Sequence, residues 1–141
     1  MSMSMRLMKA AMFKVSKSKH EFEQSVRMVR ESAIRAGWDV PWRFELQQHY
    51  RERGLSDMTK VVNVYLCNPQ GGYDIMKDDA YKPMAGLMPT AVSIYETNDG
   101  DVYVSRMNLG RMSAMFGGKV REALKSGGAN LERALEGVIE D

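Results

Sequence analysis

Alternation of apolar and polar residues predicts several short strands along this chain. Period-two patterns run through residues 7–15 and 38–46, a β-branched and aromatic run over residues 61–66 is typical of a central strand, and two further strands are expected over residues 89–95 and 102–107. The Asp99-Gly100 dipeptide between the last two patterns is a strong hairpin signal, so we expect these two strands to pair antiparallel. The first pattern also has methionines on its second side, which indicates a strand with apolar residues on both faces.

A helix is predicted between the first two strands. Apolar residues from Phe22 to Ala33 recur three and four positions apart, and charged residues occupy the opposite side. Ser18 and Glu21 have the spacing of a capping box and mark the start of the helix. Gly37 suits the left-handed position that ends a helix. This pattern predicts a helix that packs one face on a sheet.

The segment 38–46 has a competing interpretation, because its apolar positions also fit a helix that begins at Trp42. Pro41 removes one backbone donor from a strand, which indicates an edge strand or a bulge. A strand that passes into a short helix near Leu46 is compatible with both patterns. We therefore expect this compromise.

Three more helices are predicted after residue 67. The first has Asn68 as its N-cap and Pro69 in its first turn, and it runs to about residue 77. The other two cover residues 119–125 and 131–139 and are separated by a glycine-containing loop, with Asn130 as the N-cap of the last.

These elements predict the α+β class, with a mixed, largely antiparallel sheet and helices packed on one face. Residues 1–141 form one expected domain, because no linker divides the chain and a domain of this length can bury a sizeable core. Within it we expect residues 1–5 to fray and residues 108–141 to form a helical C-terminal extension.

Charge and cysteine content narrow the range of functions. Twenty basic and eighteen acidic residues are scattered along the chain, so no strong field favours nucleic acid or anionic membranes. No apolar run approaches the roughly 20 residues of a membrane span. A chain whose only cysteine is Cys67 cannot form an intramolecular disulfide, which fits a reducing compartment. We therefore expect a cytoplasmic protein.

Cys67 is the sharpest chemical candidate, because it lies at the predicted corner between a strand and a helix. The amides and dipole at a helix N-terminus would favour a reactive thiolate there, with Asn68 and Gly71 as neighbours that contact a ligand. The competing interpretation, which we favour, is that Cys67 is a small buried apolar residue. The glycines at 71 and 72 equally well serve the backbone.

The thirteen methionines suggest a second kind of site. Five of them flank the region where the strands and the C-terminal tail could converge: Met84, Met88, Met107, Met112 and Met115. A thiolate with thioethers is a soft ligand set that selects Cu(I), so Cys67, Met84 and Met88 are candidate metal ligands. Methionine is also an adaptable packing residue, and core packing or a dimer interface is the favoured interpretation.

No familiar catalytic pattern accompanies these residues. The sequence contains no Ser-His-Asp pattern, no His-Glu-x-x-His motif and no phosphate-binding loop. His49 lies near the ambiguous strand-to-helix segment and is retained as a candidate ligand-binding residue, while His20 has the position of a solvated histidine.

Several short motifs resemble the uncharacterised family called domain of unknown function 302. They are Leu66-Cys67-Asn68-Pro69, Leu87-Met88-Pro89, the hairpin around Asp99-Gly100 and the segment Ala36-Gly37-Trp38-Asp39-Val40. The resemblance covers about residues 13–107. It implies a compact β-α-β(4)-α fold, often dimeric, and no established reaction. The family often has a second cysteine where this chain has Thr90, so a two-thiol mechanism is not expected here.

Two functions remain open from the sequence. The first is a non-catalytic homo-oligomeric domain that binds a small ligand, a soft metal or a partner protein, and the absence of a catalytic pattern favours it. The alternative is a thiol-dependent redox enzyme or a sulfur carrier that uses Cys67. The sequence does not identify a cofactor or decide between enzyme and binding protein.

Overall fold

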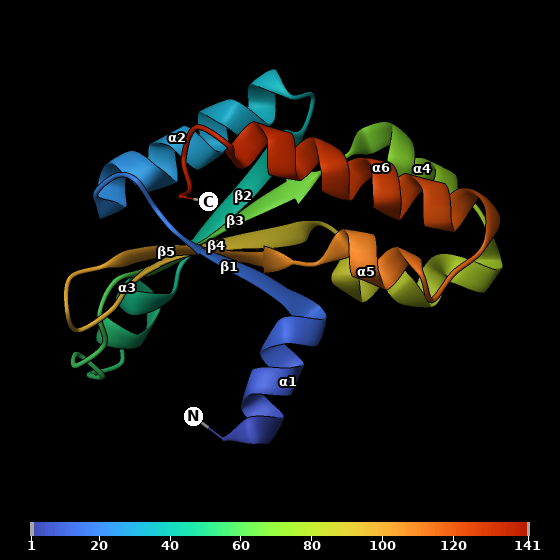
Figure 1. Ribbon diagram of the computed structural model, residues 1–141. Helices are drawn as coiled ribbons and strands as arrows, with labels where there is room; N and C mark the ends of the chain where they lie inside the picture. The colour runs from blue at the N-terminus through green and yellow to red at the C-terminus, as the bar shows by residue number, and fades with distance from the viewer. Residues whose placement is uncertain (1, 141) are drawn as a thin grey trace.

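Five strands form one antiparallel sheet in the order β1-β5-β4-β3-β2 (Figure 1). The structure, a computed structural model, describes residues 2–140. The strands are β1 (Phe13–Lys17), β2 (Asp39–Glu45), β3 (Val61–Cys67), β4 (Thr90–Glu96) and β5 (Val102–Met107). Each described pairing is antiparallel, so the sheet is simpler than the mixed, largely antiparallel arrangement that the sequence predicted.

Two helices, α2 and α6, cover one face of this sheet (Figure 1). The helical segments are α1 (Met3–Met12), α2 (Phe22–Arg35), α3 (Leu46–Arg51), α4 (Pro69–Met76), the 3-10 helix η1 (Asp79–Leu87), α5 (Leu109–Ser113) and α6 (Gly118–Leu135). The strands with α2 and α6 follow the order β-α-β(4)-α, which confirms the predicted α+β class. Within residues 2–140, no helix has the length and apolar character needed to cross a membrane.

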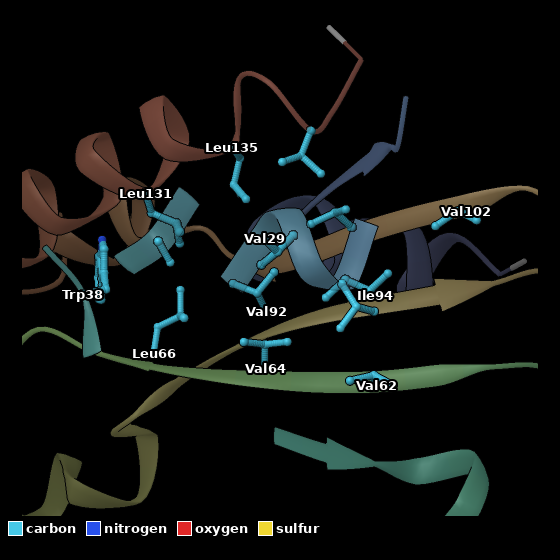
Figure 2. Packing of buried hydrophobic residues seen from close by; sticks show 14 of the residues in the cluster. Val29, Trp38, Val62, Val64, Leu66, Val92, Ile94, Val102, Leu131 and Leu135 are labelled. Carbon is cyan, nitrogen blue, oxygen red and sulfur yellow. The ribbon is translucent and has the colours of Figure 1, made fainter. Parts of the chain in front are cut away.

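The main core lies between the sheet and these two helices. Alternate residues of β3 point towards the helices, so Val62, Val64 and Leu66 are buried while their neighbours are partly exposed. They pack with Val29 of α2 and Leu131 of α6 (Figure 2). Full burial of each such side chain contributes about 1.5–3 kcal/mol, so this layer holds the helices on the sheet.

The C-terminus of α2 has the predicted glycine cap. Gly37 adopts a positive φ of 96°, its amide donates to Ile34, and the amide of Trp38 donates to Ala33, each at 3.0 Å. This is the Schellman arrangement. It directs the Trp38 indole towards α6, where Nε1 donates to Asn130 Oδ1 at 2.8 Å.

The N-terminus of α2 differs from the prediction. Glu21 is the N-cap, and its carboxylate accepts from the amides of Glu23 and Gln24. The Ser18 hydroxyl is buried and instead lies 2.6 Å from the Ser25 hydroxyl, so it stabilises the packing around α2 and does not cap the helix. The capping-box spacing therefore predicted the N-cap at Ser18, three residues before its actual position at Glu21.

The predicted strand over residues 7–15 is also wrong in its first part. Residues 3–12 form α1, because Ser2 accepts from the Met5 amide and the segment is rich in good helix formers. The strand begins only at Phe13, which pairs with Met107 of β5. Residues 3–5 of the segment expected to fray are helical, and Met1 lies outside the described residues.

The two helices predicted after residue 118 are one continuous helix, α6. Glycines inside α6 allow close approach of neighbouring groups, since a Cβ on Gly128 would lie 3.1 Å from Leu109 Cβ. Asn130 is therefore not an N-cap but a helix residue that bonds to Trp38. In contrast, the expected change from strand to short helix is confirmed, because β2 ends at Glu45 and α3 begins at Leu46.

A partly buried ion pair joins α6 to β5, next to the edge strand β1. Arg106 of β5 is only 3% exposed and donates to both carboxylate oxygens of Glu132, at 2.9 and 2.6 Å. It also donates to the hydroxyl of Ser16 on β1, and Lys14 forms a second ion pair with Glu132 at 3.1 Å. Burial of Glu132 opposes its ionisation, but the hydrogen bond and charge of Arg106, aided by Lys14, outweigh burial and lower the pKa of this carboxyl.

The variant Glu132→Gln tests this ion pair. A lowered pKa in the folded state means that the charged carboxylate stabilises the fold above about pH 4.3, and that this stability is lost as pH falls through the folded value. We expect the variant to lose about 1.5–3 kcal/mol of unfolding free energy at pH 7, because a buried guanidinium loses a charged acceptor. Urea denaturation at pH 7 and pH 3 measures the difference.

The matched control is Glu122→Gln, because Glu122 is exposed on the same helix. The control should change stability little at either pH. A loss of equal size at pH 3 and pH 7 for Glu132→Gln would contradict the role of the carboxylate charge.

Candidate functional site

A cavity of about 90 Å³ lies at one end of the sheet, where β3, α4, η1, α5 and α6 meet. Its wall includes buried residues of a second apolar cluster, among them Ile75 and Leu124. Leu87 and Asn68 also line the cavity and are exposed, so it opens to the surface beside η1. We refer to this cavity as the Cys67 pocket.

Most of the predicted site residues line this one pocket. The residues that it brings together are Cys67, Asn68, Gly71, Met84 and Met88. Met107 and Met112, two further methionines of the region flagged in the sequence, line the same pocket, whereas Met115 is 78% exposed and does not. The pocket is therefore rich in sulfur.

The corner between β3 and α4 forms as the sequence predicted. Cys67 is the last residue of β3 and is half-buried, and Asn68 is the N-cap of α4. The Asn68 Oδ1 accepts from the Gly71 amide at 3.1 Å, and the Gly72 amide donates to the Asn68 carbonyl at 2.8 Å. Because both glycine amides are already bonded, this helix start is not a ready site for an anion.

Apart from the Cys67 thiol, no side chain that could serve as a base lines the pocket within the described residues. Within residues 2–140, no aspartate, glutamate, histidine, lysine or arginine lines it. Asn68 and Thr90 contribute polar side chains to its wall, while the indole Nε1 of Trp38, another wall residue, donates to Asn130. Such a wall suits apolar or soft ligands, while general acid–base catalysis needs a titratable group within hydrogen-bonding reach.

The structure places His49 away from the pocket. Its ring lies 5.0 Å from the ring of Phe44, and its Nδ1 is 3.2 Å from Nη1 of Arg53, which follows α3. His49 therefore does not contribute to a common site with Cys67. The candidate metal ligands Cys67, Met84 and Met88 include no imidazole or carboxylate, and within the described residues no group of three histidine, cysteine or acidic side chains could hold a metal ion.

Sequence reasoning missed the part of the wall that comes from α6. Leu124 and Gly127 both line the pocket. The sequence analysis placed a loop at residues 126–130, so it did not put these two residues on the same face of one helix. A continuous helical period from Val120 through Leu124 and Gly127 to Leu131 would have found them.

The fold and the pocket together define a class. The chain is an α+β domain whose antiparallel sheet carries two helices on one face and an apolar, sulfur-lined pocket at one end. A family model described as domain of unknown function DUF302 matches residues 14–141. The chain therefore belongs to this family, and the match extends past residue 107 to include α5 and α6, which the sequence resemblance had left out.

A solved structure shows the same fold. The chain is similar to the uncharacterized conserved protein DUF302 from Bacillus stearothermophilus, with 18% sequence identity and a TM-score of 0.75. The likeness covers 88% of this chain and 95% of the other, so it extends over nearly the whole domain. No curated protein matches the chain.

Two alanine substitutions at the start of α4 test the geometry of this corner. A Cβ on Gly72 would meet no atom within 4 Å, whereas a Cβ on Gly71 would lie 3.2 Å from Asn68 Nδ2. We expect Gly72→Ala to raise the unfolding free energy by about 0.5–1 kcal/mol, because alanine is the better helix former.

Gly71→Ala should gain less than Gly72→Ala or lose stability, since it presses on the N-cap side chain. Thermal unfolding of the two variants makes the comparison. An equal gain in unfolding free energy at both positions would contradict this prediction, because it would show that the Asn68 side chain moves aside at no cost.

Proposed function

We propose that this protein is a binding domain that holds a small ligand in the Cys67 pocket and acts as a homo-oligomer. One observation carries the proposal: residues from separate parts of the sequence, between Trp38 and Gly127, converge on one apolar cavity. The pocket is smaller than the roughly 300–1,000 Å³ typical of drug-sized ligands. The ligand is therefore a group of a few non-hydrogen atoms, or one end of a longer molecule that passes the mouth beside Leu87.

The energetics of the cavity support an occupant. A ligand that fills the pocket removes the apolar wall from water, which is favourable by roughly 25 cal/mol per Å² of apolar surface buried. A ligand bound only by the folded state also stabilises the fold by mass action.

Binding is favoured over thiol chemistry by the composition of the wall. A thiol-dependent enzyme or sulfur carrier needs a group that takes the thiol proton and a way to stabilise charge. The Cys67 pocket has no such side chain within the described residues, and the Gly71 and Gly72 amides are bonded to Asn68. Cys67 fits better as part of a soft binding wall, in a reducing compartment such as the cytoplasm.

The homo-oligomer part of the proposal is supported by the face of the sheet opposite α2 and α6. We call it the open face. Trp42 and Tyr65 are cross-strand partners on this face with ring centroids 4.9 Å apart, and Tyr95 and Tyr103 form a similar pair at 5.6 Å. Trp42 is 56% exposed. Aromatic residues of this kind are enriched at protein interfaces, and a second copy would offer the same surface.

Xenon binding followed by methyl NMR tests the pocket. Xenon is a small apolar probe, and with methionine methyl groups labelled by carbon-13 it should shift the signals of Met84, Met88, Met107 and Met112. The exposed Met115 methyl is an internal control and should not shift.

The variant Ala123→Leu adds side-chain volume to the wall of the pocket and should abolish the xenon shifts. A folded Ala123→Leu variant that still responds to xenon, or a wild type with no saturable response, would overturn the proposal.

Sedimentation of Trp42→Ala tests the oligomer. If the open face forms the interface, removal of an exposed aromatic anchor should weaken self-association by about 30-fold, the equivalent of about 2 kcal/mol for a hot-spot residue. Tyr73→Ala is the matched control, because Tyr73 is 65% exposed on α4, away from the sheet. An identical effect of both variants, or a wild type that is monomeric, would refute this part.

A further inference from the structure

The Cys67 pocket gathers sulfur from three separate stretches of the chain. Cys67 ends β3, Met84 lies in η1, Met107 ends β5 and Met112 lies in α5, while Met88 follows η1 directly. Cys67, the pair Met84 and Met88, and the pair Met107 and Met112 come from three separate stretches of the sequence, so the fold brings these stretches together. One cysteine and four methionines thus line a single cavity of about 90 Å³.

We propose that the ligand of this pocket is one monovalent soft metal ion, Cu(I), held by the Cys67 sulfur and thioether sulfurs of the surrounding methionines. The inference rests on the proposed function, because it names the ligand class of the same pocket. Thiolate and thioether sulfur are the donors that select Cu(I), whereas Mg²⁺, Ca²⁺ and Mn²⁺ prefer carboxylate and carbonyl oxygen.

Charge balance points to a monovalent ion. The thiol loses its proton to solvent when the metal binds, so one thiolate and one Cu(I) form a neutral unit while the thioethers stay uncharged. The same ligands around Zn²⁺ would leave a net positive charge in an apolar cavity. Such a charge is costly to bury, and no acidic side chain of the described chain lines the pocket to offset it.

The donor set also disfavours zinc by its composition. Structural zinc sites use four cysteine or histidine ligands, and catalytic sites use three protein ligands with nitrogen, oxygen or thiolate donors. The pocket supplies only one such donor, Cys67, and His49 lies elsewhere on α3. Thioethers are the remaining donors, and they are the part of the set that makes the site specific for a soft ion.

Leucine substitutions separate coordination from packing. Leucine has nearly the size of methionine and keeps a pocket apolar, but it lacks the thioether. The double variant Met84→Leu/Met88→Leu therefore preserves the wall and the Cys67 thiol while it removes two sulfur donors. Met115→Leu is the matched control, because Met115 is 78% exposed and lies outside the pocket.

The experiment is an anaerobic titration of the full chain with Cu(I) in competition with bicinchoninate, with native mass spectrometry for the stoichiometry. We expect one ion per chain. The double variant should bind at least about tenfold more weakly, the equivalent of about 1.4 kcal/mol, while Met115→Leu matches the wild type. Cys67→Ser should lose the stoichiometric complex, because it removes the only thiolate.

Silver(I), a soft monovalent ion that is stable to oxidation, gives a second readout. Bound at the pocket, it should shift the methyl signals of Met84 and Met88 and leave that of Met115 unchanged. Equal Cu(I) affinities for wild type and double variant, or silver shifts confined to Met115, would overturn the metal proposal.

The same samples distinguish the Cu(I) proposal from the broader proposal that the Cys67 pocket binds a small ligand. If the pocket binds small ligands but no metal, xenon shifts the pocket methyl groups, the double leucine variant keeps its remaining xenon shifts, and no saturable Cu(I) complex forms. That result overturns the metal inference and leaves the binding pocket standing. If xenon and Cu(I) both fail to give a saturable response in the folded wild type, the pocket itself is refuted.

Discussion

One continuous apolar stripe on α6 connects the two packed regions of this domain. Its N-terminal half, with Val120 and Leu124, packs in the cluster that surrounds the Cys67 pocket, and its C-terminal half, with Leu131 and Leu135, packs in the main core. A rigid helix that is fixed at one end holds its other end in place. The pocket therefore depends on the core that fixes α6 to the sheet, including the ion pair of Arg106 with Glu132.

The two ends of α6 differ in how tightly they pack, and this difference makes the pocket possible. The main core consists chiefly of branched aliphatic residues on strands and helices, which have few rotamers and interdigitate closely. The second cluster is packed by five partly buried methionines, which are unbranched and adapt to irregular space. A stiff core next to an adaptable cluster is a suitable arrangement for a domain that admits a ligand without disturbing its fold.

Local signals predicted much of this fold and part of the site. The β-branched run of β3, the Asp99-Gly100 hairpin, the Gly37 cap and the Asn68-Pro69 helix start each reflect chemistry within a few residues, and each was predicted correctly. The errors arose where tertiary packing decides. Glycines at 127 and 128 looked like a loop, but Trp38 and Leu109 pack against them and the helix continues. Met107 and Cys67 likewise line the same pocket because of the order of the strands in the sheet, and strand order cannot be predicted from a local sequence pattern.

The chemistry of the pocket follows from what its wall lacks as much as from what it contains. Four flexible methionines could fill a small cavity by rotamer changes, and each contact they made would contribute dispersion energy. The proposed occupant is one that thioethers can bind, because the cavity lies among such side chains, next to a thiol and with no charged side chain of the described residues in its wall. Since thioethers bind hard ions and anions poorly, the wall favours a soft or apolar occupant over both.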